Sequence, residues 1–460
     1  RLQSAKDAQL LLDDALLNQG GLVLAGDALA VSAARIDNRD TRAEGSTQGL
    51  QGDRVALTAA QIDNQSGLIA ADKQIELQAE QALANQQGMV SSAGTLQVHA
   101  GQMGNTGGTL LSAGNQSVRA NALDGTGKLL SQGDLVLALQ QDHRNDGQIT
   151  ANGKATVSSA GRWSNAGSLQ AGELDLQAAD IDNAASGEIS GIRTRLRTDG
   201  LLSNRGLIDG VETRIDAGAV HNIGTGRIYG DQLSIGAGSV INAEEIVDGS
   251  ARAATIAARQ RLDIGTGMLL NREQALIFSA GGGADALNIG GTLDAQGHAT
   301  GRAGSVHNAS ATIESLGGLR IDAGQLVNSN EHFATAEVMV VGPTAKMYIQ
   351  PKGTPGMHDA SEFTWRSWSR AGRYWWNDGS GDVKAWTQYE VTRTEHETQV
   401  TRSAPGRIIS GGQMTLLGDD LVNDKSQILA GGALRGDLDR LRNIDAFGEY
   451  RVHEEGTSQY

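Results

Sequence analysis

The sequence predicts an all-β protein: a right-handed parallel β-helix of roughly 20-residue coils with one β-rich aromatic insertion. Three observations predict this fold. An asparagine recurs at a nearly constant interval, aliphatic and polar residues alternate between these asparagines, and one long segment departs from both patterns.

The recurring asparagine sets the period of the repeat. Successive positions are 18 to 21 residues apart, and Gly125 occupies the slot between two of them. The positions from residue 64 to residue 242 are Asn64, Asn85, Asn105, Asn145, Asn165, Asn183, Asn204, Asn222 and Asn242. Asn tolerates left-handed turns and can hydrogen-bond to identical neighbours in a stack. We therefore interpret Asn85, Asn105, Asn145 and Asn165 as a structural turn ladder in which the side chains stack in register, and not as a row of ligands.

The aliphatic residues of each repeat predict strands. The central alternating pairs are Leu96 with Val98, Leu135 with Leu137, Leu174 with Leu176, and Leu233 with Ile235. Alternation over about five residues, bounded by Gly and Asn, is typical of strands and not of helices. One 20-residue unit cannot bury its own aliphatic face, so equivalent strands of successive repeats must stack in parallel.

One break in the spacing divides the chain. The step from Asn328 to Asn423 is 95 residues, after which a step of 20 returns. We predict β-helix repeat coils over 1–328, an aromatic and Pro-rich insertion of antiparallel β-structure over 329–405, and resumed β-helix coils over 406–460, the whole being a fragment of a longer chain. Segments 337–341 and 389–401 alternate as solvated antiparallel strands do, which predicts antiparallel β-structure for the insertion.

The insertion also contains the candidate binding surface. It holds all four prolines and five of the six tryptophans of the chain. Trp, Tyr and Arg are enriched at the centres of recognition surfaces. The candidate residues are Trp365, Trp368, Arg370, Arg373, Tyr374, Trp375, Trp376 and Trp386. The alternative is that these rings form the insertion's own core or pack against the coils.

Composition restricts the classes of partner and cofactor. The net charge is −15 and the charges are scattered, which argues against nucleic acid as a partner because phosphate binding needs a basic face. Cysteine is absent, so disulfides and thiolate metal sites are excluded, and the histidines lack metal-binding spacing. No stretch approaches 18 apolar residues, so no membrane span is expected. We predict no cofactor and no metal.

Catalysis is not expected. Parallel β-helices can carry glycan-processing sites, which need carboxylates that converge on one face. The best pairs are Asp180 with Asp182 and Asp419 with Asp420, but both lie in turn segments, where Asp is common for structural reasons. We predict a non-enzymatic protein and keep a glycan-processing β-helix enzyme as an alternative.

The repeats resemble a known family. Residues 107–114, Gly-Gly-Thr-Leu-Leu-Ser-Ala-Gly, resemble the repeats of filamentous haemagglutinin-type proteins exported by two-partner secretion. Residues 403–412, Ser-Ala-Pro-Gly-Arg-Ile-Ile-Ser-Gly-Gly, resemble an element of long contact-dependent growth inhibition exoproteins.

The resemblance implies a role and a location. It implies a secreted or cell-surface stalk of a Gram-negative bacterium, exported through an outer-membrane two-partner-secretion transporter. The stalk would present a region that binds a receptor, protein or glycan, on a neighbouring cell, and the full-length protein would deliver a C-terminal toxin. A plain adhesin filament that binds host or bacterial surfaces is the alternative.

Overall fold

The computed structural model describes residues 1–42, 48–368 and 371–460, without the side chain of Trp368. It separates into two compact units. Unit 1 comprises Arg1–Asn330 and Pro405–Ile444, and unit 2 comprises Glu331–Ala404 and Asp445–Tyr460. Each unit is described by itself.

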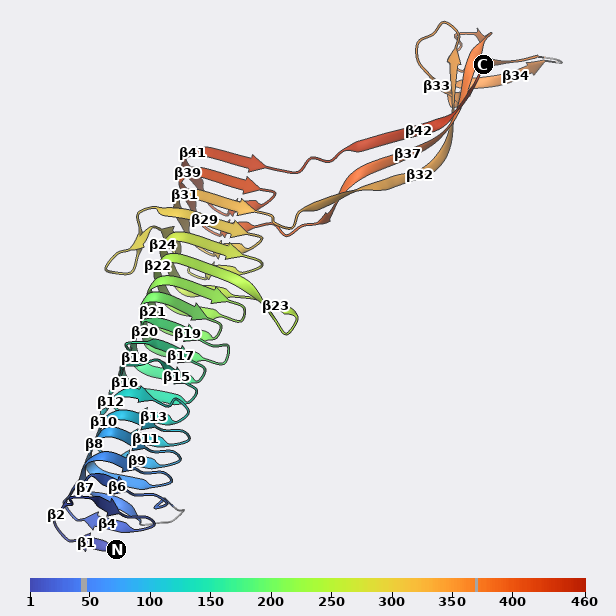
Figure 1. Cartoon of the computed structure of the whole chain (residues 1–460). Helices are drawn as coiled ribbons and strands as arrows, with labels where there is room; N and C mark the ends of the chain where they lie inside the picture. The colour runs from blue at the N-terminus through green and yellow to red at the C-terminus, as the bar shows by residue number, and fades with distance from the viewer. Residues whose placement is uncertain (43–47, 369–370) are drawn as a thin grey trace. The chain divides into compact units, whose positions relative to one another are not determined.

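Unit 1 is a stack of β-coils whose equivalent strands pair in parallel along one continuous sheet (Figure 1). This confirms the predicted parallel β-helix. The strands up to the tenth coil are β1 Leu2–Ser4, β2 Ala8–Leu11, β3 Ala15–Leu17, β4 Leu22–Ala25, β5 Ala28–Ser32, β6 Arg35–Asp37, β7 Gly49–Asp63, β8 Leu68–Ala84, β9 Met89–Ser92, β10 Thr95–Gly104, β11 Thr109–Ser112, β12 Gln116–Leu123, β13 Lys128–Ser131, β14 Leu135–Leu139, β15 His143–Asn145, β16 Gln148–Ser159, β17 Arg162–Asn165, β18 Ser168–Gln177, β19 Asp180–Asn183 and β20 Glu188–Asn204.

The later coils carry two hairpins that lie outside the regular repeat. In one, β23 pairs antiparallel with the end of β22, and in the other, β27 pairs with β28. The strands are β21 Leu207–Ile223, β22 Arg227–Val247, β23 Ser250–Ala253, β24 Thr255–Arg272, β25 Leu276–Ser279, β26 Leu287–Gly290, β27 Thr292–Leu293, β28 Ala299–Thr300, β29 Ala303–Ala309, β30 Thr312–Ser315, β31 Leu319–Ser329, β38 Arg407–Ser410, β39 Met414–Asp424, β40 Gln427–Ala430 and β41 Leu434–Ile444.

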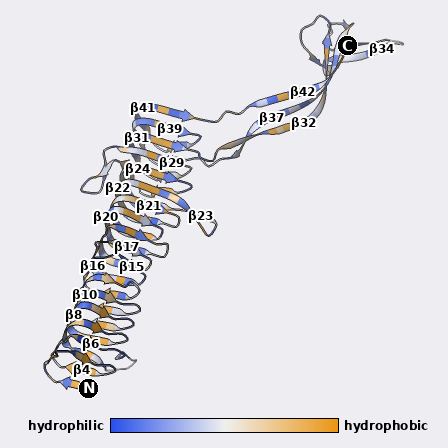
Figure 2. Cartoon of the chain, viewed as in Figure 1, coloured by the Kyte–Doolittle hydropathy of each residue, from blue (hydrophilic) through white to orange (hydrophobic). Residues whose placement is uncertain are grey.

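The core of unit 1 consists of columns of aliphatic side chains that run from coil to coil. The predicted alternating pairs supply two of these columns, and Leu135, Leu137, Leu233 and Ile235 are fully buried. Along the coil strands hydrophobic and hydrophilic residues alternate (Figure 2), because successive side chains of a strand point to opposite faces. Parallel stacking therefore buries each aliphatic residue between its equivalents in the two adjacent coils.

Gln116 interrupts one of these columns. It is paired with Leu96 and Leu135 in the adjacent coils and is 1% exposed. Its Nε2 and Oε1 atoms are both buried without a hydrogen-bond partner among the described residues. A buried amide that lacks partners loses its hydration without compensation, so this position destabilises the stack.

Replacing Gln116 by leucine is expected to raise the free energy of unfolding by about 1 to 3 kcal/mol, because the change removes two unsatisfied polar atoms and restores the aliphatic column. Chemical denaturation of the two proteins measures the difference. Gln132→Leu, at an exposed position, is the control and should change stability by no more than about 0.5 kcal/mol. A lower stability of Gln116→Leu would show that the amide has a bound partner, such as an internal water.

His143 and Trp163 interrupt a second column, between Leu123 and Ile181. Both side chains are buried, and their rings lie 4.5 Å apart. His143 Nδ1 lies 3.0 Å from the Leu123 carbonyl oxygen, so Nδ1 carries the proton of the neutral ring, and Nε2 has no partner among the described residues. Burial lowers the pKa of His143 to about 4, against weaker opposing effects of the Leu123 carbonyl, Asp124 and Asp146.

Unit 2 consists of two antiparallel sheets. One has the strand order β33-β32-β37-β42 and the other the order β34-β35-β36. The elements are β32 Ala334–Pro351, β33 His358–Asp359, the single 3-10 turn η1 Ala360–Glu362, β34 Phe363–Trp368, β35 Ala371–Trp376, β36 Asp382–Val383, β37 Trp386–Arg402 and β42 Tyr450–Gln459.

The position of β42 corrects the predicted segment 406–460. Residues 407–444 are coil strands, as expected, but residues 445–460 belong to unit 2. From Tyr450↔Glu397 to Gln459↔Gln388, β42 pairs antiparallel with β37. The alternation in β42 fits a sheet with solvated residues, and the segment lacks the Leu-x-Leu pair that a coil strand needs to fill the core.

Candidate functional site

The predicted binding surface lies on the small sheet of unit 2, and its rings divide between the two faces. Cross-strand partners share a face, and β34 and β35 pair Phe363 with Trp376, and Trp365 with Tyr374. The other face carries Trp375 together with the paired Arg366 and Arg373. Of the eight predicted residues, Arg370 and the side chain of Trp368 lie outside the described part of the chain.

The first face forms the core of unit 2. Phe363 and Tyr374 are buried with Ile349 of β32 and Val383 of β36, and Trp376 and Trp386 pack against this cluster. The Phe363 and Trp376 rings lie 4.3 Å apart. Burial raises the pKa of the Tyr374 phenol, whose hydroxyl donates to Gln388 Oε1 at 3.3 Å. Several of the predicted recognition residues therefore have a packing role.

Trp365 is the ring at the margin of this core. It is 49% exposed, although it makes edge contacts with Tyr374 at 4.8 Å and with Trp386 at 5.6 Å between ring centroids. Such pairs each contribute about 0.5 to 1.5 kcal/mol beyond the area that they bury. These contacts hold the indole in one orientation while half of its surface faces solvent.

Gly372 makes this orientation possible. A Cβ atom at Gly372 would lie 1.9 Å from Cζ2 of Trp365, so the indole rests on the bare backbone of the neighbouring strand. A glycine near a cross-strand aromatic residue has no side chain, so the aromatic ring can cover the backbone there. The sequence motif Arg-Ala-Gly-Arg gave no indication of this contact, because it depends on the register of β34 and β35.

The second face has a cationic character. The guanidinium of Arg366 lies 5.0 Å from the Trp375 ring centroid, which is within the range of a cation–π interaction. Arg373 donates to the Asp382 carboxylate at 2.5 Å. On this face Trp375 is half-buried, whereas Arg373 is exposed. Among the described residues this face therefore offers the Trp375 indole and two guanidinium groups, and the Asp382 carboxylate is paired with Arg373.

An open pocket of about 400 Å³ lies beside Trp386 and is lined by Ala385, Trp386, Gln388, Gln459 and Tyr460. The Lys352 ammonium lies 5.9 Å from the centroid of the Tyr460 ring. Two aromatic rings and two side-chain amides provide apolar and hydrogen-bonding surface together, which is typical of small-ligand sites. Trp386 thus serves both the core and the pocket.

In unit 1 the asparagines of the predicted ladder occupy equivalent turns. Asn85 Nδ2 donates to Asn105 Oδ1 at 2.8 Å, and Asn145 Nδ2 donates to Asn165 Oδ1 at 2.8 Å. Gly125 separates these two pairs, so no amide bridges Asn105 and Asn145 directly. Beyond Asn165 the same bond connects each asparagine to the next as far as Asn443. The ladder is made of intramolecular bonds and presents no free amide row to a ligand.

The two candidate catalytic pairs are occupied by structural contacts. Asp180 accepts a hydrogen bond from the Leu201 backbone N–H at 2.9 Å. Asp419 and Asp420 form separate ion pairs, with Arg302 at 2.5 Å and Arg442 at 2.9 Å respectively. Across the described residues no group of three or more His, Asp or Glu side chains could hold a metal ion. Asp180, Asp419 and Asp420 therefore each have a structural partner.

Sequence comparison matches four stretches of the chain to the haemagglutinin repeat: residues 4–53, 50–135, 111–167 and 378–443. Together they cover half of the chain. The chain belongs to the haemagglutinin repeat family. The first three matched stretches lie in the coils of unit 1. The fourth covers part of unit 2 and the coils that follow it in the sequence. No curated protein and no solved structure matched the chain.

Membership of the haemagglutinin repeat family indicates a secreted or cell-surface protein with a filamentous, adhesin-like stalk. Family and fold together point to a structural, non-enzymatic protein. In the described part of the chain no helix is long and apolar enough to cross a membrane.

Proposed function

We propose that the chain is a stalk segment of a surface filament of a Gram-negative bacterium, and that unit 2 binds a receptor on a neighbouring cell. The filament would leave the cell through an outer-membrane two-partner-secretion transporter. The coils supply a repetitive framework, and unit 2 supplies a surface of a different composition. The half-exposed ring of Trp365, fixed against Gly372, is the observation that carries the receptor-binding proposal.

The continuity of the coils supports separate roles for the coils as framework and for unit 2 as binding surface. Asn328 Nδ2 donates to Asn423 Oδ1 at 2.8 Å, and Leu326 pairs with Leu421, although 94 residues separate the two asparagines in the chain. The chain leaves the coils after Asn330 and returns at Pro405 in the adjacent coil. The register of the coils is therefore the same before and after segment 331–404.

Delivery of a C-terminal toxin, by resemblance to the contact-dependent growth inhibition exoproteins, is the finer form of the proposal. A plain adhesin filament is the competing form. Both use the same stalk and the same recognition unit, so sequence beyond residue 460 that encodes a toxin domain would distinguish them.

Replacing Trp365 by alanine is expected to weaken binding of the whole chain to receptor-bearing cells by about 1 to 3 kcal/mol, or roughly 5- to 150-fold, as is typical of an aromatic anchor. Binding to a panel of bacterial and host cells, measured with labelled protein, provides the affinity. Trp375→Ala tests the opposite face in the same assay.

Phe363→Leu is the matched control, because Phe363 is buried in the same cluster. It should lower the melting temperature of unit 2 and leave the affinity of the folded protein unchanged. Unaltered affinity of Trp365→Ala and Trp375→Ala, with a lowered melting temperature, would mean that the aromatic residues only stabilise unit 2, and the receptor-binding proposal would be rejected.

A further inference from the structure

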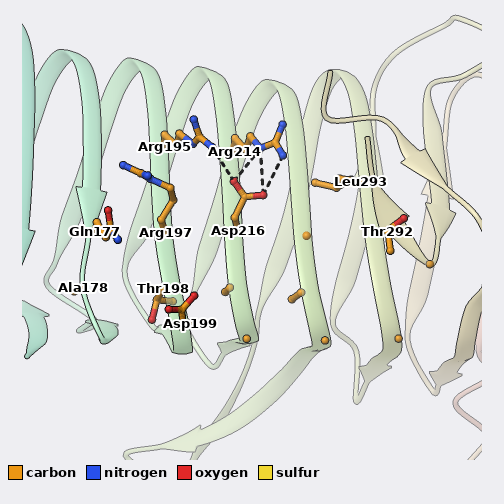
Figure 3. A pocket seen from close by; sticks show the side chains of 18 residues that line it. Gln177, Ala178, Arg195, Arg197, Thr198, Asp199, Arg214, Asp216, Thr292 and Leu293 are labelled. Carbon is orange, nitrogen blue, oxygen red and sulfur yellow. Dashed lines mark hydrogen bonds and ion pairs between the residues drawn. The ribbon is translucent and has the colours of Figure 1, made fainter. Parts of the chain in front are cut away.

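The outer surface of the coils carries a groove (Figure 3). A hairpin forms one of its walls, glycines and other small residues form its floor, and arginines line one side. Its volume is about 790 Å³, and its lining residues come from β18, β20, β21, β22, β24 and the β27–β28 hairpin. Five stacked coil strands at a spacing of about 4.8 Å give the groove a length of roughly 20 Å. This coil groove is separate from unit 2.

The β27–β28 hairpin forms one wall and is held firmly in place. Cβ atoms at Gly236 and Gly265 would lie 3.1 Å from Leu293 Cδ1 and 2.3 Å from the Thr292 carbonyl carbon, so these two glycines let the hairpin lie flat on the coils. The buried carboxylate of Asp263 accepts a hydrogen bond from the Ala299 N–H at 2.9 Å. These contacts indicate a preformed wall, and preformed sites bind without a large ordering cost.

The floor has almost no side chains. Gly218, Gly238 and Gly267 line it and are exposed, together with small residues such as Ala237. A Cβ atom at Gly238 or Gly267 would lie 2.9 Å from the carbonyl oxygen of the preceding coil, so the close stacking of the turns disfavours larger residues. The floor is therefore flat and exposes backbone along several coils.

Three guanidinium groups lie on one side of the groove. Arg195 and Arg214 are paired in adjacent coils, and Arg197 stands two residues further along β20. Arg197 donates to both oxygens of Asp175, at 2.8 and 3.0 Å, and Arg214 donates to Asp216 at 2.9 Å. Among the described residues the one ion pair of Arg195 is with Asp216 at 3.5 Å, a carboxylate that Arg214 already contacts. Two carboxylates thus serve three guanidinium groups on this rim.

The groove also carries an acceptor. Asp199 lies two residues beyond Arg197 on β20, at the level of Gly218, and Figure 3 draws it below the three arginines. Asp199 is exposed, as is the amide of Gln177 at the end of the groove. A ligand that fits these groups must offer an anionic group to the arginines and hydroxyl donors to Asp199 and Gln177. A polymer that carries only carboxylates would bring a like charge to Asp199, and a neutral polymer would leave Arg195 uncompensated.

We propose that the coil groove binds a carboxylated polysaccharide of the polyuronate type, extended along the stack of coils, with a carboxylate on Arg195 and its hydroxyl groups toward Asp199. Each uronate ring carries both chemical groups, and an extended chain matches an open groove of this length. The site lies on the stalk and goes beyond the receptor binding proposed for unit 2.

Titration calorimetry with the whole chain at low salt tests this proposal with three probes of similar length: oligogalacturonate, dextran and polyglutamate. Oligogalacturonate is expected to bind, and its affinity should fall as salt is added. Arg195→Gln should weaken this binding about tenfold or more, because a charge-assisted contact is lost. Arg144→Gln, which removes an exposed arginine paired with Asp146 outside the groove, should leave it unchanged.

Asp199→Asn provides a second, independent variant. It should weaken oligogalacturonate binding while it strengthens any binding of polyglutamate, because the repulsive carboxylate is removed. Binding of dextran equal to that of oligogalacturonate, tighter binding of polyglutamate to the unmodified chain, or equal losses in Arg195→Gln and Arg144→Gln would each overturn the proposal. Trp365→Ala should not change oligogalacturonate binding, so this result is distinct from the receptor test of unit 2.

Discussion

Replacing Asn222 by alanine is expected to lower the free energy of unfolding of the coils by about 3 kcal/mol or more. Asn222 is fully buried in the middle of the ladder. Its Oδ1 accepts from Asn204 at 2.8 Å, and its Nδ2 donates to Asn242 Oδ1 at 2.8 Å and to the Thr255 carbonyl at 3.0 Å. Alanine removes all three of these hydrogen bonds, and each loss costs about 1 kcal/mol or more.

Asn222→Asp separates hydrogen bonding from volume. The carboxylate keeps the acceptor for Asn204 but places negative charge against two acceptor oxygens, so this variant should be at least as unstable as the alanine variant. The loss is measured by chemical denaturation, and hydrogen exchange should show that protection falls most in the coils next to residue 222, since each coil contacts only its neighbours.

Asn152→Ala and Asn152→Asp are the controls, because Asn152 is exposed at another corner of the coils. Both should change stability by no more than about 0.5 kcal/mol. Equal effects of the substitutions at 152 and 222 would show that the ladder amides contribute nothing beyond the conformational preference of asparagine for turns.

Acidification is expected to destabilise unit 1 through His143, by about 3 kcal/mol when it is complete. The folded-state pKa is about 4, whereas the ordinary pKa of the side chain is 6.5. Between these values the unfolded chain binds a proton that the folded chain does not bind, so stability falls as the pH drops below about 6.5. The loss is complete below about pH 4, and it is absent at neutral pH, where both states are neutral.

His143→Leu tests the assignment, because leucine fills the column with an apolar side chain that does not titrate. The free energy of unfolding, followed from pH 7 to pH 4, should fall less in this variant than in the parent chain by about 3 kcal/mol. Parallel curves for the two proteins would contradict the assignment. Asp124 and Asp146, the nearby acids, are present in both proteins.

The fold could be predicted because the same turn and strand patterns recur in every repeat. The period of the asparagines locates the turns, and pairs such as Leu135 and Leu137 locate the strands that fill the core. The prediction that residues 445–460 form coils is wrong because β42 pairs with β37, a strand about 60 residues away in sequence. A local period in the sequence does not indicate such long-range pairing. The loss of the Leu-x-Leu pattern after Asn443 was the available signal.

The candidate site was less predictable. Composition identifies the aromatic segment, but the direction of each ring depends on register, which buries Tyr374 and leaves Trp365 half exposed. The coil groove could not be predicted at all. Arg195 and Arg214 become neighbours only when the coils stack, and the groove exists only because the hairpin after Gly290 lies on Gly236.

The way in which the coils accept extra residues makes them a scaffold for display. The antiparallel pairing of β22 with β23 begins two residues after Asn242, and segment 331–404 begins three residues after Asn328, yet each asparagine remains bonded to its equivalent in the next coil. The turn after a ladder asparagine therefore tolerates sequences from about ten residues to a whole folded unit. Foreign loops grafted after Asn183 or Asn204 would be carried at a chosen height on the stack, in steps of about 4.8 Å.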